Sequence, residues 1–339
     1  MSAYVLGFAA PLILWPLRRL SRYGFVAALS LAWALFAGLR LGIGGNDYFA
    51  YEAFYAAPSL YEPLFRALGR LSLAAGTGAH GFFSLVALLI ALPSVYVIDK
   101  RAGDDPLALL IYGMEWFLYG SFVILRQGIA MGLAFLAYDA IEERRYPAFA
   151  AFAAAAAGFH YSALVLLALP LFMGELKPAL RWLLLGGAFA ALISLETTLT
   201  VIAGISTKSP LMNRLLYYLG PGGGERLNLL NIAEIAAWFV LINRYAPLKD
   251  ALKRNAYLLY VCFAVLALQD AIFIRFGWYF EIAVALFLPL ILKEAWKRRY
   301  EGAVVSVGLF LYYAAKTARW LLTNADGLGG FLPYRWIIG

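Results

Sequence analysis

Charged side chains are scarce in this sequence. Only 14% of its 339 residues are charged and 63% are hydrophobic, whereas a soluble domain has roughly 25% charged and about 45–50% apolar residues. The apolar residues form blocks of about 15 to 20, the length at which a helix crosses about 30 Å of hydrocarbon. This pattern excludes a water-soluble globular domain. It predicts an all-α polytopic integral membrane protein with about 12 transmembrane helices (roughly 10–12).

Cysteine and histidine are nearly absent. The chain has one cysteine, Cys262, and two histidines, so neither an intrachain disulfide nor a cysteine-based metal site is expected. No metal-ligand spacing occurs, and no metal or cofactor is predicted. The net charge of +8 is spread over short clusters, without a basic tail or a soluble domain, so nucleic acid is not an expected partner.

The N-terminal stretch lacks the marks of a cleavable signal. Met1 to Leu17 has no basic region before its apolar residues and no small-residue cleavage site, so it reads as a first membrane span. The sequence has no membrane-external domain of useful size. Residues 1–339 are therefore predicted to form a single transmembrane domain.

Twelve spans are expected, and their orientation follows from the basic residues. The spans lie near 3–17, 24–39, 81–98, 106–124, 127–141, 147–159, 161–173, 182–203, 228–243, 256–272, 277–292 and 302–320. Alternate turns carry Arg18, Arg19, Arg22, Lys100, Arg101, Arg144, Arg145, Lys177, Arg181, Arg244, Lys249, Lys253, Arg254, Lys293, Lys297, Arg298 and Arg299. Positive loops stay in the cytoplasm, which places both termini on the opposite, external face of the membrane.

Residues 147–173 allow two interpretations. They form either one long tilted span or two short helices that break at His160. A single span would invert every later loop and place the basic turns at 244–254 and 293–299 outside, against the charge rule. Two short broken helices are therefore favoured, since such helices are tolerated where they line a protein cavity.

Two external loops are predicted, near residues 40–80 and 204–227. The first contains an aromatic stretch from Asn46 to Glu52. Apolar residues then recur at helical spacing from Leu64 to Leu73, which predicts an amphipathic helix on the membrane surface. The second contains a glycine-rich segment, Pro221 to Gly224, which is either a mobile lid or a linker.

Polar residues interrupt the apolar runs at a few positions. A charged group at membrane depth costs roughly 2.5–3.5 kcal/mol, so Arg126, followed by Gln127, needs a reason. Its side chain either snorkels to lipid phosphates or holds a diphosphate in an external cavity. His160 is either a structural residue at a helix break or a functional one, and Ser162 either orients it or bonds the backbone.

Other polar residues extend this pattern. Arg275 either forms a surface ion pair with Asp270 or belongs to a site, and Glu281 follows one to two turns later. Glu115, Glu196 and Glu234 lie within spans and are expected to pair internally or to face a cavity. The side chains that fall on the external side of the predicted topology are Asp47, Glu62, Arg126, His160, Arg214 and Arg275. Since they come from separate loops, they predict a shared external cavity.

Several motifs together resemble a known family. They are Asn46-Asp47-Tyr48-x-x-Tyr51, Tyr61-Glu62-Pro63, Arg126-Gln127-Gly-Ile-Ala130, Phe159-His160-Tyr-Ser162-Ala163, Arg275-Phe-x-x-Tyr279 and Leu332-Pro333-Tyr334-Arg335. Their order and spacing along nearly the whole chain resemble the EpsG family of Wzy-like exopolysaccharide and O-antigen polymerases. The alanine-rich region 147–159 departs from the family pattern.

The resemblance implies a glycosyltransferase that joins undecaprenyl-diphosphate-linked oligosaccharides at the periplasmic or outer leaflet. Arg126 and Arg275, with Arg214, would stabilise the departing diphosphate. His160 is the candidate general base, with Asp47 or Glu62 as competitors. Tyrosines 48, 51, 217 and 218 would stack on sugars, and Gln127, Ser162, Glu281 and Tyr334 complete the expected substrate contacts. Bilayer lipids, a chain-length regulator and a flippase are candidate partners.

Other functions stay open. An O-antigen ligase or a polyprenyl-phosphate-sugar transferase would use the same external arginines. A flippase or other transporter predicts a charged path through the membrane and repeats between its halves. The intramembrane glutamates favour it, but no repeat is found. A structural subunit would tolerate the loss of His160 and Arg126.

Overall fold

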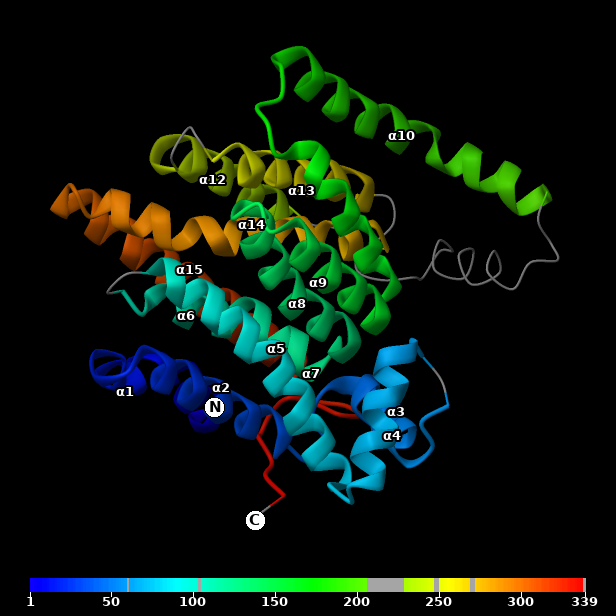
Figure 1. Ribbon diagram of the computed structural model, residues 1–339, viewed down its shortest axis with the longest axis vertical. Helices are drawn as coiled ribbons and strands as arrows, with labels where there is room; N and C mark the ends of the chain where they lie inside the picture. Colours follow the sequence, from blue (N-terminus) through cyan, green and yellow to red (C-terminus); the bar gives the residue numbers. More distant parts are fainter. Residues whose placement is uncertain (60, 103–104, 206–228, 247–249, 269–271, 338–339) are drawn as a thin grey trace. The chain divides into compact units, whose positions relative to one another are not determined.

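The computed structural model describes residues 1–59, 61–102, 105–205, 229–246, 250–268 and 272–337 (Figure 1). These residues form fourteen α-helices, one π-helical segment and one 3-10 helix, and they contain no sheet. In chain order the elements are α1 (Ser2–Leu20), α2 (Arg22–Gly38), α3 (Gly45–Ala56), α4 (Pro63–Ala74), α5 (Gly78–Ala102), α6 (Leu107–Tyr112), η1 (Gly113–Phe117), α7 (Leu118–Phe122), α8 (Leu125–Glu142), α9 (Tyr146–Phe159), η2 (Tyr161–Phe172), α10 (Pro178–Ile205), α12 (Leu229–Tyr245), α13 (Ala251–Ala267), α14 (Ile272–Ala295) and α15 (Arg299–Thr323).

The helices follow the predicted spans closely. Each predicted span overlaps mainly one helix, except that 106–124 is divided among α6, η1 and α7, and 256–272 covers most of α13 and reaches the first residue of α14. Among the described residues, two helices are long and apolar enough to cross a membrane by length and composition, at Gly78–Arg101 and Ile272–Ala295. The all-α class is confirmed, and the count of about twelve membrane spans stays a prediction.

The chain divides into two compact units. The first comprises Met1–Leu164 and Leu288–Gly339, and the second comprises Val165–Phe287. The expectation of a single transmembrane domain over residues 1–339 concerns the assembly of both units and stays a prediction.

Close helix contacts organise the first unit. α5 packs against α2 and α8, while α1 packs against α2 and α9 against α8. Small residues make this possible: a Cβ on Gly128 would lie 2.5 Å from the Gly120 carbonyl oxygen, and one on Gly132 would lie 3.0 Å from that of Leu89. Gly128 and Gly132 form a GxxxG pair, the spacing that lets helix backbones approach closely in membranes.

The predicted break at His160 is confirmed. α9 ends at Phe159, and His160 adopts an extended conformation with φ −156° and ψ 117°. A 3-10 helix, η2, begins at the next residue. The chain therefore leaves α-helical geometry at His160.

The predicted external loop near 40–80 is largely helical. α4 begins at Pro63, as its apolar spacing predicted, but the aromatic stretch before it also forms a helix, α3, which the sequence interpretation missed. Gly44 and Gly45, with φ of 135° and 63°, supply the turn that leads into α3, because these are conformations that glycine adopts at little cost. Both of their N–H groups donate to the Gly329 carbonyl at 3.0 Å.

The C-terminal tail, residues 324–337, holds this turn in place. Leu41 N–H donates to the Arg335 carbonyl at 2.9 Å, and Ile337 N–H donates to the Leu39 carbonyl at 3.1 Å. Tyr4 donates its hydroxyl hydrogen to the Phe331 carbonyl at 2.9 Å. The end of α15, the tail, the end of α2 and the start of α3 thus lie at one end of the first unit.

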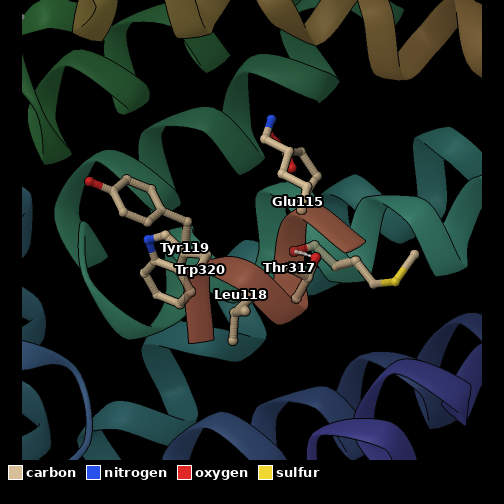
Figure 2. Close-up of a pocket in the computed structure, with 7 residues that line it drawn as sticks. Glu115, Leu118, Tyr119, Thr317 and Trp320 are labelled. Carbon is tan, nitrogen blue, oxygen red and sulfur yellow. Dashed lines mark hydrogen bonds and ion pairs between the residues drawn. The ribbon is translucent and has the colours of Figure 1, made fainter. Parts of the chain in front are cut away.

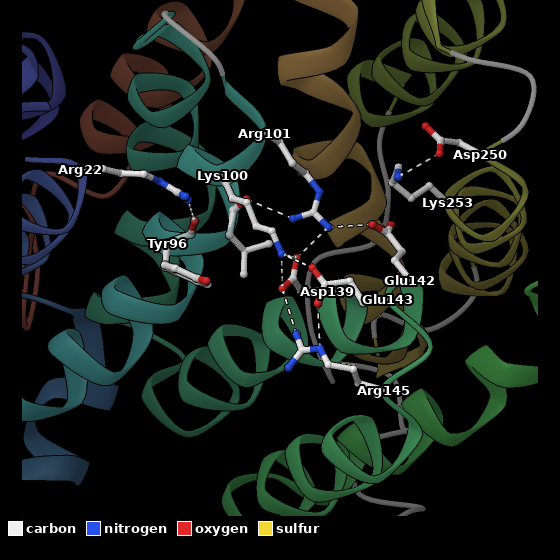
Figure 3. A network of polar contacts seen from close by, with 11 residues as sticks. Arg22, Tyr96, Lys100, Arg101, Asp139, Glu142, Glu143, Arg145, Asp250 and Lys253 are labelled. Carbon is white, nitrogen blue, oxygen red and sulfur yellow. Dashed lines mark hydrogen bonds and ion pairs between the residues drawn. The ribbon is translucent and has the colours of Figure 1, made fainter. Parts of the chain in front are cut away.

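The basic turns of the first unit meet acidic side chains. Arg18 and Arg22 both bind Asp99, at 2.5 and 2.6 Å. Lys100, Arg101 and Arg145 bind Asp139, Glu142 and Glu143 (Figure 3). We call this second group the basic-turn network. Turns predicted to share the cytoplasmic face are therefore joined by ion pairs.

The second unit contains most of η2, α10, α12, α13 and the first part of α14. The Asn255 side chain caps the end of η2 by donating to the Phe172 and Gly174 carbonyls at 2.9 and 2.7 Å. The Tyr257 hydroxyl donates to the Ile235 carbonyl at 2.5 Å, which joins α13 to α12. Phe263 and Phe280 stack with their centroids 5.7 Å apart, so aromatic packing joins α13 to α14.

Candidate functional site

Glu62 is the centre of a polar cluster in the first unit. One carboxylate oxygen, Oε2, accepts a hydrogen bond from Arg126 Nη1 at 2.6 Å. The other, Oε1, lies 2.9 Å from His160 Nδ1. Glu62 is only 5% exposed. We call these three residues the Glu62 cluster; they come from three separate segments: the start of α4, the start of α8 and the break after α9.

The contact with Glu62 fixes the form of the His160 ring. An ionised carboxylate can only accept hydrogen bonds, so Nδ1 must carry the hydrogen. In the neutral ring the lone pair is then on Nε2. A carboxylate that holds imidazole in this tautomer, and stabilises imidazolium when it forms, is the partner that a histidine base requires.

Electrostatics keep Glu62 ionised. Burial alone would raise its pKa, but the hydrogen bond to His160 and the charge of Arg126 outweigh burial and lower the pKa to about 2. A group with so low a pKa is a poor proton acceptor near neutral pH. Of the competing bases, Glu62 is therefore better suited to orienting His160 than to removing a proton itself.

Tyr61 covers Arg126 from the other side. The guanidinium carbon lies 4.1 Å from the centroid of the Tyr61 ring, within the range of a cation–π interaction. Tyr61 has φ +73°, a conformation that costs a non-glycine residue roughly 1–2 kcal/mol. Ring contacts with Tyr51, Phe54 and Phe65 hold it there, and strain of this kind is common at functional sites.

The Arg126 side chain retains unused hydrogen-bonding capacity. Its Nε–H is buried and has no hydrogen-bond partner within the described part of the chain. The side chain as a whole is 21% exposed. A guanidinium has five N–H donors in a planar fork, so binding Glu62 leaves donors that suit phosphate oxygens.

Tyr51 connects α3 to the cluster. Burial raises the pKa of its hydroxyl to about 12, and the nearby charge of Arg126 opposes this shift while that of Asp47 adds to it. Asp47 and Tyr51 are four residues apart on α3 and therefore share one face of the helix. Asp47 and Tyr51, both predicted site residues, are thus part of the electrostatic environment of Arg126.

Other predicted residues occupy different surroundings. Tyr48 is 1% exposed and its ring contacts Phe83 at 5.1 Å, while Gln127 is buried in α8. Ser162 is half-buried in η2. The Tyr334 hydroxyl donates to the Phe36 carbonyl.

The remaining predicted residues lie in the second unit or outside the described residues, and their place in the site stays a prediction. Arg275 and Glu281 belong to α14 in the second unit. Arg214, Tyr217 and Tyr218 lie outside the described residues, as does Asp270. Of the six charged residues predicted to share an external cavity, Glu62, Arg126 and His160 are in contact, and Asp47 lies close by.

The sequence interpretation missed a buried arginine. Arg40 is 0% exposed, and its Nε donates to the Ile43 carbonyl at 2.8 Å. The rings of Phe83 and Phe122 lie 4.8 and 4.6 Å from its guanidinium carbon. Burial lowers the pKa of this guanidinium to about 10. The sequence contained one signal for this residue: Arg40 stands alone between an apolar run and a glycine-rich turn.

The class of protein follows from these features. In the part of the chain that the structure describes, the fold is all-α and two helices meet the length and composition of membrane spans. A carboxylate there joins an arginine to a histidine. The EpsG family matches residues 23–336, a range that contains all three cluster residues. The chain belongs to the EpsG family, which is associated with exopolysaccharide biosynthesis. No curated protein and no solved structure matches the chain.

Proposed function

We propose that this protein is a polytopic inner-membrane glycosyltransferase that polymerises undecaprenyl-diphosphate-linked oligosaccharides into exopolysaccharide or O-antigen. The observation that carries the proposal is the Glu62 cluster, which joins three segments predicted to lie on the external face. Family membership supports a role in exopolysaccharide biosynthesis. The cluster supplies the two kinds of group that the transfer reaction needs, a cation and a proton acceptor.

The proposed reaction exchanges one sugar–oxygen bond for another. The bond between the terminal sugar carbon and the diphosphate oxygen breaks, and the diphosphate leaves with the bonding electrons. The acceptor hydroxyl forms the new bond to that carbon and gives its proton to His160 Nε2. Glu62 stabilises the imidazolium that results.

Arg126 is the residue proposed to stabilise the departing diphosphate. Charge develops on the diphosphate as it leaves, and a fixed guanidinium in a partly buried site stabilises that charge without reorganising. The Tyr61 ring and the Glu62 carboxylate hold its plane, at 4.1 Å from the ring centroid and 2.6 Å from Oε2. Arg275 and Arg214 remain proposed further cations for the same charge.

The test is polymer formation in a deletion strain that produces single variants. Arg126→Ala and His160→Ala are each expected to abolish long ladders and to accumulate single-repeat lipid, a loss of at least about 100-fold for a general base. The matched controls are Arg70→Ala, an exposed arginine on α4, and His80→Ala, the other histidine. Both controls are expected to keep the ladder.

The outcome also separates the rival functions. Normal ladders in both Arg126→Ala and His160→Ala, at normal protein levels, would refute the catalytic assignment. Single-repeat lipid that accumulates on the cytoplasmic leaflet would indicate a flippase, whereas accumulation on the external leaflet supports polymerisation. Loss of polymer attachment with intact free polymer would indicate a ligase.

A further inference from the structure

The buried guanidinium of Arg40 donates to three chain segments, a turn and two helix ends. Nε donates to the Ile43 carbonyl in the turn before α3 at 2.8 Å, and Nη1 donates to the Ala37 carbonyl in the last turn of α2. Nη2 donates at 3.5 Å to the carbonyl of Phe122, the last residue of α7. Among the described residues no carboxylate pairs with Arg40. The partners of this charge are therefore backbone carbonyls and aromatic rings.

The two helix-end carbonyls need a donor from outside their own helices. The last carbonyls of a helix have no partner within it, and a buried carbonyl without a donor is unfavourable. In a longer α2, Ala37 would accept from Leu41 N–H, but that N–H donates to the C-terminal tail. In a continuous helix Phe122 would accept from Arg126 N–H, but the chain breaks between α7 and α8. Arg40 supplies a donor to both helix ends.

Arginine is the residue type that these three acceptors require. Its planar fork carries five N–H donors, whereas the donors of lysine all sit on one nitrogen. A positive charge is also favourable beside helix C-termini. In addition to Phe83 and Phe122, the ring of Tyr48 in α3 lies 5.7 Å from the guanidinium carbon. Because a buried charge without a counter-ion is costly, these contacts are what offset the burial of Arg40.

The turn before α3 also meets Phe122 through its own backbone. A Cβ on Gly44 would lie 2.5 Å from the Phe122 carbonyl oxygen, whereas a Cβ on Gly45 would meet nothing within 4 Å. Only glycine at position 44 therefore lets the two segments approach this closely. Arg40 bonds both sides of this contact, at Ile43 and at Phe122.

Toward α15, the packing around α7 is incomplete. Leu118 and Tyr119 of α7 line a pocket of about 140 Å³ together with Trp320 of α15 (Figure 2). The rings of Tyr119 and Trp320 meet at nearly a right angle, with centroids 6.0 Å apart. Atoms beside a cavity lose the dispersion contacts of a filled interior, and a helix of only five residues has little stability of its own. The contacts of α7 with Arg40 and with the turn therefore matter for its position.

Both segments that Arg40 holds lead directly to the Glu62 cluster. Arg126 follows Phe122 by four residues across the break between α7 and α8. In α3, Tyr51 follows Tyr48 by about one helical turn and interacts electrostatically with Arg126. A shift of either segment would therefore move a group in or beside the cluster.

We propose that Arg40 is a positioning residue of the Glu62 cluster, an inference that rests on the proposed function where it concerns the reaction rate. Arg40 acts through other residues: it fixes the connection between α7 and α8 against the turn before α3. This holds Arg126 where its Nη1 reaches Glu62 Oε2 at 2.6 Å. Displacement of a charge-stabilising group by about 1 Å can lower a reaction rate by up to about 100-fold.

The first test is Arg40→Lys in the full chain. Lysine keeps the charge but cannot reach all three carbonyls, so the polymerisation rate is expected to fall about tenfold. The half-saturating substrate concentration should stay within about twofold, because positioning of Arg126 acts on the transition state. Arg335→Lys is the matched control: this exposed arginine donates to the Gly42 carbonyl of the same turn at 3.0 Å. Its rate is expected to stay within about twofold of wild type.

A glycine pair tests the same contact without changing Arg40. Gly44→Ala places a methyl group against the Phe122 carbonyl and is expected to lower the rate at least about fivefold more than Gly45→Ala does. Both positions have positive φ, so strain in the turn is present in both variants. This pair decides the question if Arg40→Lys does not fold.

Amide hydrogen exchange supplies a measurement that does not depend on the reaction. In Arg40→Lys, peptides covering residues 41–51 and 119–127 should exchange at least about fivefold faster than in wild type, and peptides covering residues 139–145 should be unchanged. This pattern in a protein whose wild type forms no polymer would support the inference and overturn the proposed function. Unchanged exchange in both segments, equally faster exchange at 139–145, or an unchanged rate in a polymerising protein would overturn the inference and leave the proposed function intact.

Discussion

Two charged groups in the first unit are built on different plans. In the basic-turn network, three cations share three carboxylates, and most members have more than one partner (Figure 3). In the Glu62 cluster one carboxylate serves both Arg126 and His160. A network with several pairs tolerates the loss of one member, whereas a cluster with one carboxylate does not.

The surroundings of the two groups differ as well. Glu62 is 5% exposed, while the Glu143 side chain is 43% exposed. Next to Glu62, Tyr61 holds a left-handed backbone conformation and Arg126 retains a buried N–H without a partner in the described chain. A strained backbone and a buried donor without a partner are both unfavourable. Strain of this kind persists where the surrounding structure enforces it, often at functional sites. These differences support the proposal that the Glu62 cluster serves chemistry, whereas the basic-turn network serves the fold.

The most direct test of the difference between the two groups is to replace one carboxylate in each with a neutral amide. Glu62→Gln is expected to reduce polymer yield at least about 100-fold, because His160 loses the partner that fixes its tautomer and stabilises its charged form. Glu143→Gln is expected to keep polymer yield within about twofold, since exposed ion pairs contribute little. Ladder analysis at matched protein levels measures both. Equal yields from the two variants would remove the distinction.

A smaller effect is expected from the ring that covers Arg126. Tyr61→Leu removes the cation–π contact and should lower the polymerisation rate about tenfold, equivalent to about 1.4 kcal/mol at a partly desolvated site. Tyr61→Phe keeps the ring face and should restore most of that rate. Measuring rate and half-saturating substrate concentration separately shows whether Tyr61 positions Arg126. A phenylalanine variant as poor as the leucine variant would assign the role to the hydroxyl.

The positions of the helices could be predicted from the sequence because apolar blocks and basic turns are local patterns. The break at His160 was predictable for the same reason, since a polar residue interrupts an apolar run. The motifs resembling the EpsG family also placed Glu62, Arg126 and His160 among the site candidates. Each of these inferences depends on residues near one another in the chain.

The pairing of these residues could not be predicted. Glu62 lies 64 and 98 positions from its partners, and no local pattern reports such a contact. The same holds for Lys316, which meets Glu115 across 201 positions, and for the tail that fixes the turn before α3. The choice between Glu62 and His160 as base required the pKa of Glu62, which follows from burial and partners and not from sequence order.

The smallest expected effect is on stability as a function of pH. The pKa of Glu62 is about 2 in the folded protein against an ordinary value of 4.5. A lowered folded-state pKa contributes stability that is present above about pH 4.5 and lost as the pH falls toward 2. The wild type should therefore unfold a few degrees above Glu62→Gln at pH 6, and the gap between the two midpoints should narrow below about pH 4.5 and be only partly closed at pH 3. Thermal unfolding in detergent between pH 3 and pH 7 measures this difference between the midpoints.

Glu143 provides the control. The hydrogen bond from Lys100, and then the charge of Lys100, also lower the pKa of Glu143, but solvent screens this exposed side chain. Glu143→Gln should then differ less from the wild type across the same range, and a pH dependence as large as that of Glu62→Gln would show that the network holds its charges as tightly as the cluster does.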